Sequence, residues 1–178
     1  MAVNSKKKGN RGERKIVEML NNHFDTKEFA RVPASGAIST IHKLSKNSIK
    51  SYCGDIVTPD NFRFSVENKY GYEVDLYNLF QEDNGDKRKI QDFIDQAIKD
   101  SSKVSGIEPM VIYTRTRKKP LVAIRKLVLT TDLLNSLNQY IVFKYKKEEW
   151  IVSDLNEILR NFPKEFFFLD NCEKENAN

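Results

Sequence analysis

The chain has 178 residues, of which 39% are apolar, and it carries a formal net charge of +5. This length predicts one globular domain and excludes two large ones. No apolar run approaches the roughly 18 residues that cross a membrane, and the basic, polar start is unlike a signal peptide. The two cysteines match no metal-ligand spacing and are expected to be reduced thiols. We therefore expect a cytoplasmic protein with no membrane partner.

The charge is distributed unevenly along the chain. Residues 1–60 carry 11 Lys and Arg against 6 Asp and Glu, residues 61–126 carry 13 against 10, and residues 127–178 carry 6 against 9. A basic N-terminal part favours phosphate binding, because neutralising phosphates releases condensed counterions. Charge alone does not establish a nucleic-acid partner, since many basic N-termini are only solvated.

The first third of the chain predicts a helix followed by a long loop. Residues 1–9 are expected to form a flexible basic arm, and a helix is predicted from Asn10. Its apolar residues recur at helical spacing: Ile16, Val17, Leu20 and Phe24. Residues 29–33 look extended, and residues 34–54 are rich in Ser, Lys and Gly. Such a composition indicates a loop of the kind that often carries function.

A β-hairpin is predicted next. Asp55 begins a short strand, residues 58–61 form a turn, and apolar Phe62, Phe64 and Val66 then alternate with polar residues. Further along, residues 90–98 predict an amphipathic helix. The other expected elements are strands at 110–113 and 121–124 flanking a basic turn, a helix after Thr131, a strand at 140–145 and a helix at 153–161. This order argues for an α/β sandwich around a mixed sheet.

Charged side chains on the second hairpin strand are candidates for chemistry. Glu67 and Lys69 are two residues apart and therefore share a face, while the hairpin would bring Asp55 opposite Glu67. Two carboxylates and a lysine suit Mg²⁺, which takes oxygen ligands, and phosphodiester hydrolysis, in which the lysine orients water or offsets negative charge. The alternative is a surface ion pair on a half-exposed strand.

Glu13 lies at the N-terminal end of the apolar face of the first helix. A carboxylate there needs a partner, and a metal cluster or its bound water is one candidate. A favourable interaction with the helix dipole is the other. The sequence leaves both readings open.

Four motifs resemble those of a known superfamily. They are Lys8-Gly-Asn-Arg-Gly-Glu13-Arg14, Arg31-Val-Pro-Ala-Ser35-Gly36, Gly54-Asp55 and Glu67-Asn-Lys69. Their order is similar to that of the PD-(D/E)XK nucleases, and most similar to archaeal-type Holliday junction resolvases, over residues 6–125. The resemblance implies a restriction-endonuclease-like α/β/α sandwich with a central mixed β-sheet. Residues 10–126 would form the nuclease core, and residues 127–178 a C-terminal α/β extension.

The resemblance also implies roles for individual residues. Asp55 and Glu67 would be metal ligands together with the backbone carbonyl of Asn68, and Lys69 would be the catalytic lysine. Glu13 would join the acidic cluster directly or through water, and Ser35 would lie near the scissile phosphate. The residues expected to bind DNA are Arg14 and Arg31 from the motifs, Lys6, Lys7, Lys8 and Arg11 from the basic N-terminal part, and Lys43, Lys46 and Lys50 from the loop.

Resolvases of this kind are Mg²⁺-dependent homodimers that make paired nicks in four-way DNA junctions. The resemblance therefore implies Mg²⁺, with Mn²⁺ as a substitute, and branched DNA as the partner, in the cytoplasm of a bacterial, archaeal or phage-infected cell. A nuclease with another specificity, such as a nicking, repair or restriction enzyme, would share the same catalytic residues. A non-catalytic DNA-binding subunit of a recombination complex is a further alternative.

The sequence departs from the superfamily pattern in three places. Gly54-Asp55 replaces the usual Pro-Asp, and Asn68 stands where an apolar residue is typical, so that its amide would turn toward the core. Residues 127–178 exceed the minimal resolvase, and their acidic balance argues against contact with duplex DNA. This segment is expected to pack on the core, form a dimer surface or bind a protein partner.

Overall fold

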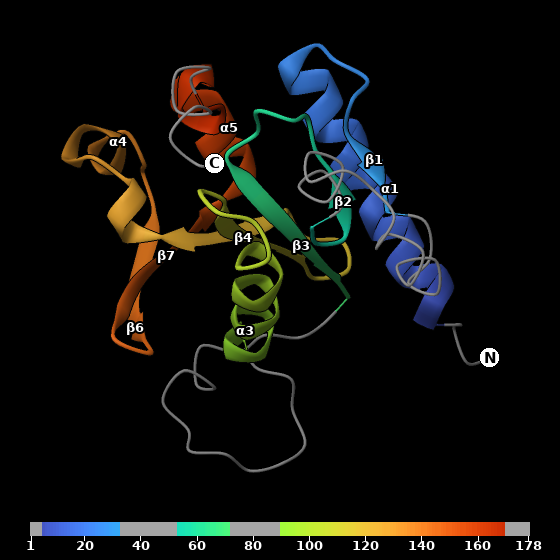
Figure 1. Ribbon diagram of the computed structural model, residues 1–178, viewed down its shortest axis with the longest axis horizontal. Coiled ribbons are helices and arrows are strands. Elements are labelled where there is room, and N and C mark those ends of the chain that lie inside the picture. Colours follow the sequence, from blue (N-terminus) through green and yellow to red (C-terminus); the bar gives the residue numbers. More distant parts are fainter. Residues whose placement is uncertain (1–4, 33–52, 72–89, 170–178) are drawn as a thin grey trace.

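A mixed sheet with helices on both faces organises the chain (Figure 1). The structure, a computed structural model, describes residues 5–32, 53–71 and 90–169. Its elements are α1 (Ser5–Phe24), β1 (Ala30–Arg31), β2 (Ile56–Val57), β3 (Phe64–Tyr70), α3 (Ile90–Ser101), β4 (Glu108–Thr114), β5 (Leu121–Arg125), η3 (Lys126–Val128), α4 (Thr131–Asn135), β6 (Tyr140–Tyr145), β7 (Glu148–Asp154), α5 (Leu155–Asn161) and η4 (Lys164–Phe167).

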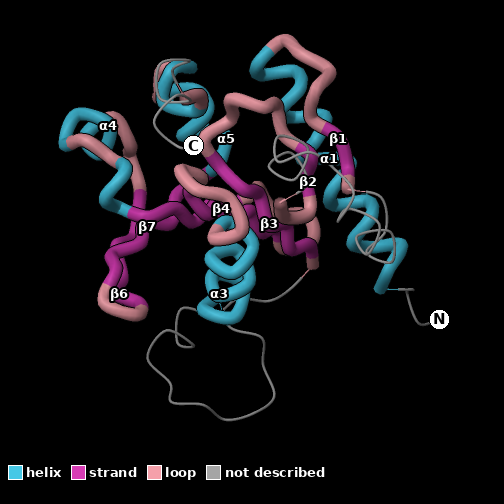
Figure 2. Tube along the Cα trace, in the orientation of Figure 1, coloured by secondary structure: helices cyan, strands magenta, loops and turns pink. Residues whose placement is uncertain are grey.

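The main sheet has five strands in the order β3-β4-β5-β7-β6. β3 and β4 are parallel, which requires the crossover through α3, whereas the other neighbours are antiparallel. β3 and β6 are therefore the two edge strands, with α1 at the β3 end in Figure 1 and the strands running through the centre in Figure 2. The predicted fold class, an α/β sandwich with a mixed sheet, is confirmed.

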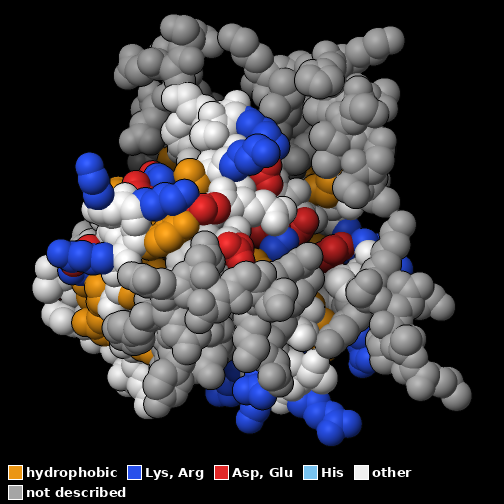
Figure 3. Space-filling model, turned by 90° about the horizontal axis from the view of Figure 1, so that it is seen from below, with side chains coloured by type: hydrophobic (Ala, Val, Ile, Leu, Met, Phe, Trp, Pro, Cys, Tyr) orange, Lys and Arg blue, Asp and Glu red, His pale blue; other side chains and the backbone are white. Residues whose placement is uncertain are grey.

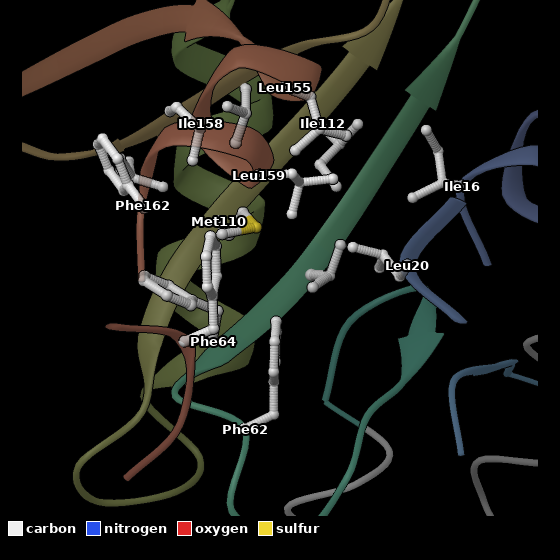
Figure 4. Packing of buried hydrophobic residues seen from close by; sticks show 14 of the residues in the cluster. Ile16, Leu20, Phe62, Phe64, Met110, Ile112, Leu155, Ile158, Leu159 and Phe162 are labelled. Atoms are coloured by element: carbon white, nitrogen blue, oxygen red, sulfur yellow. The ribbon is translucent and has the colours of Figure 1, made fainter. Parts of the chain in front are cut away.

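Apolar side chains alternate between the two faces of the sheet and bury both. On one face, Phe64 of β3 and Met110 of β4 belong to one core cluster with Ile16 of α1 and Leu155 of α5 (Figure 4). On the other face, Val111 of β4 packs with the apolar side of α3. Because helices cover both faces, the central strands are apolar on both sides and the core is continuous along the sheet.

Helix α1 begins at Ser5, five residues before the predicted start at Asn10. Residues 5–9 of the predicted flexible arm are thus helical, while residues 1–4 lie outside the described residues. The apolar pattern could not locate this start, because the first turns carry lysines rather than core residues. Lysine is a good helix former, so the helix extends beyond its apolar face.

The predicted hairpin between residues 55 and 66 is wrong. β2 pairs instead with β1, and the chain meets β3 through an isolated parallel bridge between Gly54 and Val66. Gly54 has φ +89°, and a Cβ there would lie 2.4 Å from the carbonyl oxygen of Val66. The close approach of this segment to β3 therefore requires glycine at position 54. The two segments form a single β-bridge and not a continuous ladder of backbone hydrogen bonds. The alternation predicted for β3 is correct.

The C-terminal segment contributes to the same sheet. The paired strands β4 and β5 and the strand β6 are confirmed, but β7, which lies between β5 and β6, was not predicted. The β6–β7 turn gives no glycine signal, because Lys146 and Lys147 adopt its positive φ values of 48° and 69°. No helix among the described ranges is long and apolar enough to cross a membrane.

Candidate active site

Two carboxylates and a lysine meet at the free edge of β3. Glu67 and Lys69 stand on β3, and Asp55 lies beside it on the segment that precedes β2. The Asn68 backbone N–H donates to Asp55 Oδ2 at 2.9 Å, and Lys69 Nζ lies 3.9 Å from the same oxygen. Lys69 Nζ also donates to Glu67 Oε1. The three side chains therefore converge, although Asp55 reaches Glu67 by lying alongside β3 and not through a hairpin.

The cluster is buried to an extent that excludes a surface ion pair. The side chain of Glu67 is 1% exposed, that of Lys69 14% and that of Asp55 31%. Burial, together with the nearby Asp55 carboxylate, raises the pKa of Glu67 to about 8, although Lys69 opposes the shift. One lysine does not balance two carboxylates here. An additional cation would favour the charged form of Glu67.

The donor set fits a hard divalent cation. Glu67 Oε2 is buried and has no hydrogen-bond partner within the described part of the chain, so one carboxylate oxygen is available as a ligand. Magnesium binds such oxygens and fills its remaining positions with water and substrate phosphate. Among the described residues no group of three or more His, Cys, Asp and Glu is placed to hold a metal. Asp55, Glu67 and the carbonyl of Asn68 stay the predicted ligands.

Glu13 has a partner that the sequence did not indicate. Arg31 Nε donates to Glu13 Oε2 at 2.6 Å, and Arg31 Nη2 donates to Asn10 Oδ1 at 2.8 Å. The pair ties β1 to α1, and both side chains are largely buried. A role for Glu13 through a water and a phosphate contact by Arg31 stay predictions. No short-range pattern links residues 13 and 31, which is why this pair was missed.

The side chain of Asn68 turns into the core as its alternation predicted. Asn68 is 6% exposed, and neither atom of its amide has a hydrogen-bond partner within the described residues. It shares a face of β3 with Phe64 and Val66, which belong to the core cluster that includes α1. Leaving such an amide unsatisfied costs about 1–3 kcal/mol. Asn68, at a position where the superfamily typically has an apolar residue, is therefore unfavourable for stability.

The predicted DNA-binding residues fall into three groups. Arg11 and Arg14 are exposed on α1, whereas Lys6, Lys7 and Lys8 belong to the helix without described side chains. Lys43, Lys46 and Lys50 lie outside the described residues, as does Ser35, which was predicted to lie near the scissile phosphate. On the face of the molecule in Figure 3, acidic side chains gather near the centre, with Lys and Arg side chains among and around them.

Comparison with known proteins agrees with this geometry. Residues 4–168 match the family model described as "Phage putative PDDEXK endonuclease". The chain belongs to this family. No curated protein and no solved structure matches it.

Family membership supports the PD-(D/E)XK superfamily and an endonuclease activity. PD-(D/E)XK nucleases generally use divalent metal ions, and a nuclease binds DNA. Asp55 and the Glu67-Asn-Lys69 segment have the order of the motif that gives the superfamily its name. The match to the family model does not extend to the archaeal-type resolvases, so that specificity is a matter for proposal.

Proposed function

We propose that this chain is a Mg²⁺-dependent DNA endonuclease that hydrolyses phosphodiester bonds at Asp55, Glu67 and Lys69 and leaves a 5′-phosphate. Mn²⁺ would substitute for Mg²⁺. The observation that supports this most directly is the buried carboxylate of Glu67, which stands beside Asp55 and Lys69 and has an oxygen without a partner among the described residues. A structural ion pair with Lys69 has no need for a second carboxylate.

Each side chain of the cluster has a distinct task. A divalent cation held by Asp55 and Glu67 would polarise the phosphoryl oxygen and lower the pKa of a bound water. Lys69 lies within reach of both carboxylates, so its ammonium is fixed without a substrate. It is placed to orient the attacking water and to offset the negative charge that develops on the phosphate. The N–H of Asn68 holds Asp55 against β3 and so fixes the distance between the carboxylates.

Four-way DNA junctions are the substrate we propose. This specificity is supported by the order of the four motifs, from the basic start of α1 to Glu67-Asn-Lys69. Paired nicks would need a homodimer, and the acidic residues 127–178 would offer a surface to a protein partner. A nicking, repair or restriction specificity is the alternative, because loops and dimer geometry choose the substrate and the catalytic residues are shared.

The test is cleavage of a synthetic four-way junction beside linear duplex, flap and single-stranded DNA, with Mg²⁺, Mn²⁺ or EDTA. Glu67→Gln keeps the shape of the side chain and removes its charge, so it should abolish cutting in Mg²⁺. The matched control is Glu165→Gln, an exposed carboxylate on η4, which should cut like the parent protein.

Paired nicks confined to the junction and lost with Glu67→Gln would support the full proposal. Equal cutting of all four substrates would retain the nuclease and reject the junction specificity. Cutting that persists in Glu67→Gln would reject the proposed site. The mass of the purified protein in solution decides separately whether it is a dimer.

A further inference from the structure

A basic groove of about 760 Å³ lies between α1 and the turn that joins β4 to β5. Arg11, Arg14 and Lys15 line it from α1, Arg117 and Lys118 line it from the turn, and Tyr70 of β3 lies between them. Glu18 is the one carboxylate in this lining, so five cations face a single anion. Tyr70 follows Lys69 on β3, so the groove and the candidate active site share the end of this strand.

The α1 side of the groove follows from helical spacing. Arg11, Arg14, Lys15 and Glu18 recur at intervals of three and four residues and so share one face of the helix. The core residues Ile16 and Leu20 occupy the opposite face. The cations are therefore presented to the groove by a helix whose other side is fixed in the core.

The β4–β5 turn is brought to the groove by strand register. β3 and β4 are parallel with Tyr70 opposite Thr114, and the Gly71 N–H donates to the Thr114 carbonyl at 2.7 Å. Beyond Thr114 the chain turns, with Arg117 at φ +63° and a hydrogen bond of 3.0 Å from the Lys118 N–H to the Arg115 carbonyl. Residues almost fifty positions apart thus meet at one end of the sheet.

Close packing holds the two sides together. A Cβ on Gly12 of α1 would lie 2.3 Å from Cβ of Tyr70, so glycine permits the helix to rest directly on the end of β3. Tyr70 therefore fixes α1 relative to the β4–β5 turn. A groove of defined width follows from this contact.

The cationic side chains of the groove have no ionic partner among the described residues. Within the described ranges, no side-chain hydrogen bond or ion pair involves Arg11, Arg14, Lys15, Arg117 or Lys118. Elsewhere, Arg125 pairs with Glu108 and Glu148, and Lys126 pairs with Glu149. Five cations that repel one another across a groove destabilise the fold slightly, and an anionic ligand would relieve this repulsion.

We infer that the groove binds the phosphodiester backbone of the substrate DNA next to the active site. The bound DNA strand would lie between Arg117 and Lys118 on one side and the cations of α1 on the other. The inference rests on the proposed nuclease function and adds a DNA path and a second set of phosphate contacts to it. Five cations line the groove, which suits a chain of phosphates. Lys118 is thereby assigned a role that its place in a turn did not indicate.

Fluorescence anisotropy of a labelled four-way junction and a labelled duplex, titrated in EDTA at several NaCl concentrations, tests the groove without cleavage. The double variant Arg117→Ala, Lys118→Ala should weaken binding of both DNAs at least tenfold. The slope of log K against log salt should fall by about two, because each lost phosphate contact lowers it by about one. Lys147→Ala is the matched control, a basic residue with φ +69° in the β6–β7 turn away from the groove.

Unchanged affinity and slope in the double variant, or an equal loss in Lys147→Ala, would overturn the inference. Cleavage of the same junction in Mg²⁺ separates it from the proposed function. If the parent protein cuts and the double variant binds normally, only the groove is wrong. If the double variant loses binding and the parent protein never cuts with any metal, the groove stands and the proposed function fails. Thermal unfolding of both variants verifies that they fold.

Discussion

The candidate active site and the basic groove, which share β3, differ in the burial and the pairing of their charged side chains. At the candidate active site, Glu67 is buried, Asp55 and Lys69 are partly buried, and Lys69 pairs with both carboxylates beside β3. In the groove, cations such as Arg14 and Lys118 are exposed and have no ion pair in the described part of the chain. Buried charges depend on each other, so one substitution should disable the cluster. Exposed charges act almost independently, so substitutions in the groove should have graded, salt-sensitive effects.

Lys69→Met should show the largest effect and the clearest contrast with the groove. The variant removes a buried ammonium that both carboxylates face, and cleavage should fall by about 10²–10³-fold, as it does when one preorganised electrostatic partner is lost. Junction affinity in EDTA should change less than threefold. Single-turnover cleavage at saturating DNA, together with anisotropy, measures both quantities.

The groove variant provides the opposite pattern. Arg117→Ala, Lys118→Ala should recover most of its cleavage rate once DNA is saturating, because its chemistry is intact. A Lys69→Met protein that binds DNA as poorly as the groove variant would contradict the separation of the two regions.

The pH dependence of stability should single out Glu67. Its folded pKa of about 8 is above the ordinary value of 4.5, so the folded protein retains a proton that the unfolded chain releases. In EDTA, stability should therefore fall as pH rises from about 4.5 to about 8 and then level off. Glu67→Gln should lose this part of the pH dependence, and Mg²⁺ should stabilise the parent protein more at pH 8 than at pH 5.

Urea unfolding at several pH values measures this effect, and Glu165→Gln is the control that should retain the slope of the parent protein. The groove variant should retain it as well, because its cations lie in water. An unchanged slope in Glu67→Gln would mean that Glu67 is not the group that holds the proton.

Local sequence patterns predicted β3, the strand that bears Glu67 and Lys69. Contacts between residues far apart in the sequence could be predicted only in part. Period-two alternation in β3 placed Glu67 and Lys69 on one face and Phe64 and Val66 on the other. The convergence of Asp55 was predicted through a hairpin that does not form, because Gly54 bridges to β3 in parallel. Asp55 was nevertheless predicted to lie near Glu67, because residues this close in sequence can be brought together by a hairpin or by a parallel bridge.

Other features depended on contacts that the sequence does not encode locally. The Glu13–Arg31 pair joins a helix to a strand, and β7 was missed because lysines replace glycine in the turn before it. The sequence indicates one side of the groove, because the spacing of four residues places them on one face of α1: Arg11, Arg14, Lys15 and Glu18. Its other side could not be predicted, because the register of β3 against β4 sets which turn faces α1.

Gly12→Ala tests the contact that links the two regions. Alanine favours a helix by up to about 1 kcal/mol relative to glycine, but its Cβ would lie 2.3 Å from Cβ of Tyr70. The overlap should dominate and destabilise the protein by about 1–3 kcal/mol. Displacement of α1 should also weaken DNA binding in the groove.

Gly9→Ala is the matched control in the same helix, since the nearest atom to its Cβ would be Glu13 Oε1 at 3.9 Å. It should stabilise the protein by up to about 1 kcal/mol. Equal effects of the two variants in urea unfolding would show that Tyr70 does not fix the helix.

Asn68→Leu should have the smallest effect. It tests whether the buried amide of Asn68, beside Glu67 and Lys69 on β3, lowers the free energy of unfolding. The amide of Asn68 is buried without a partner among the described residues, so an apolar side chain of similar size should stabilise the protein by about 1 kcal/mol. Asn21→Leu is the contrasting variant, because the Asn21 amide donates to the Phe29 carbonyl and accepts from its N–H. It should destabilise the protein by about 1–3 kcal/mol. If Asn68→Leu destabilises as much as Asn21→Leu, the Asn68 amide is satisfied in the folded protein and cannot be an unfavourable feature of the site.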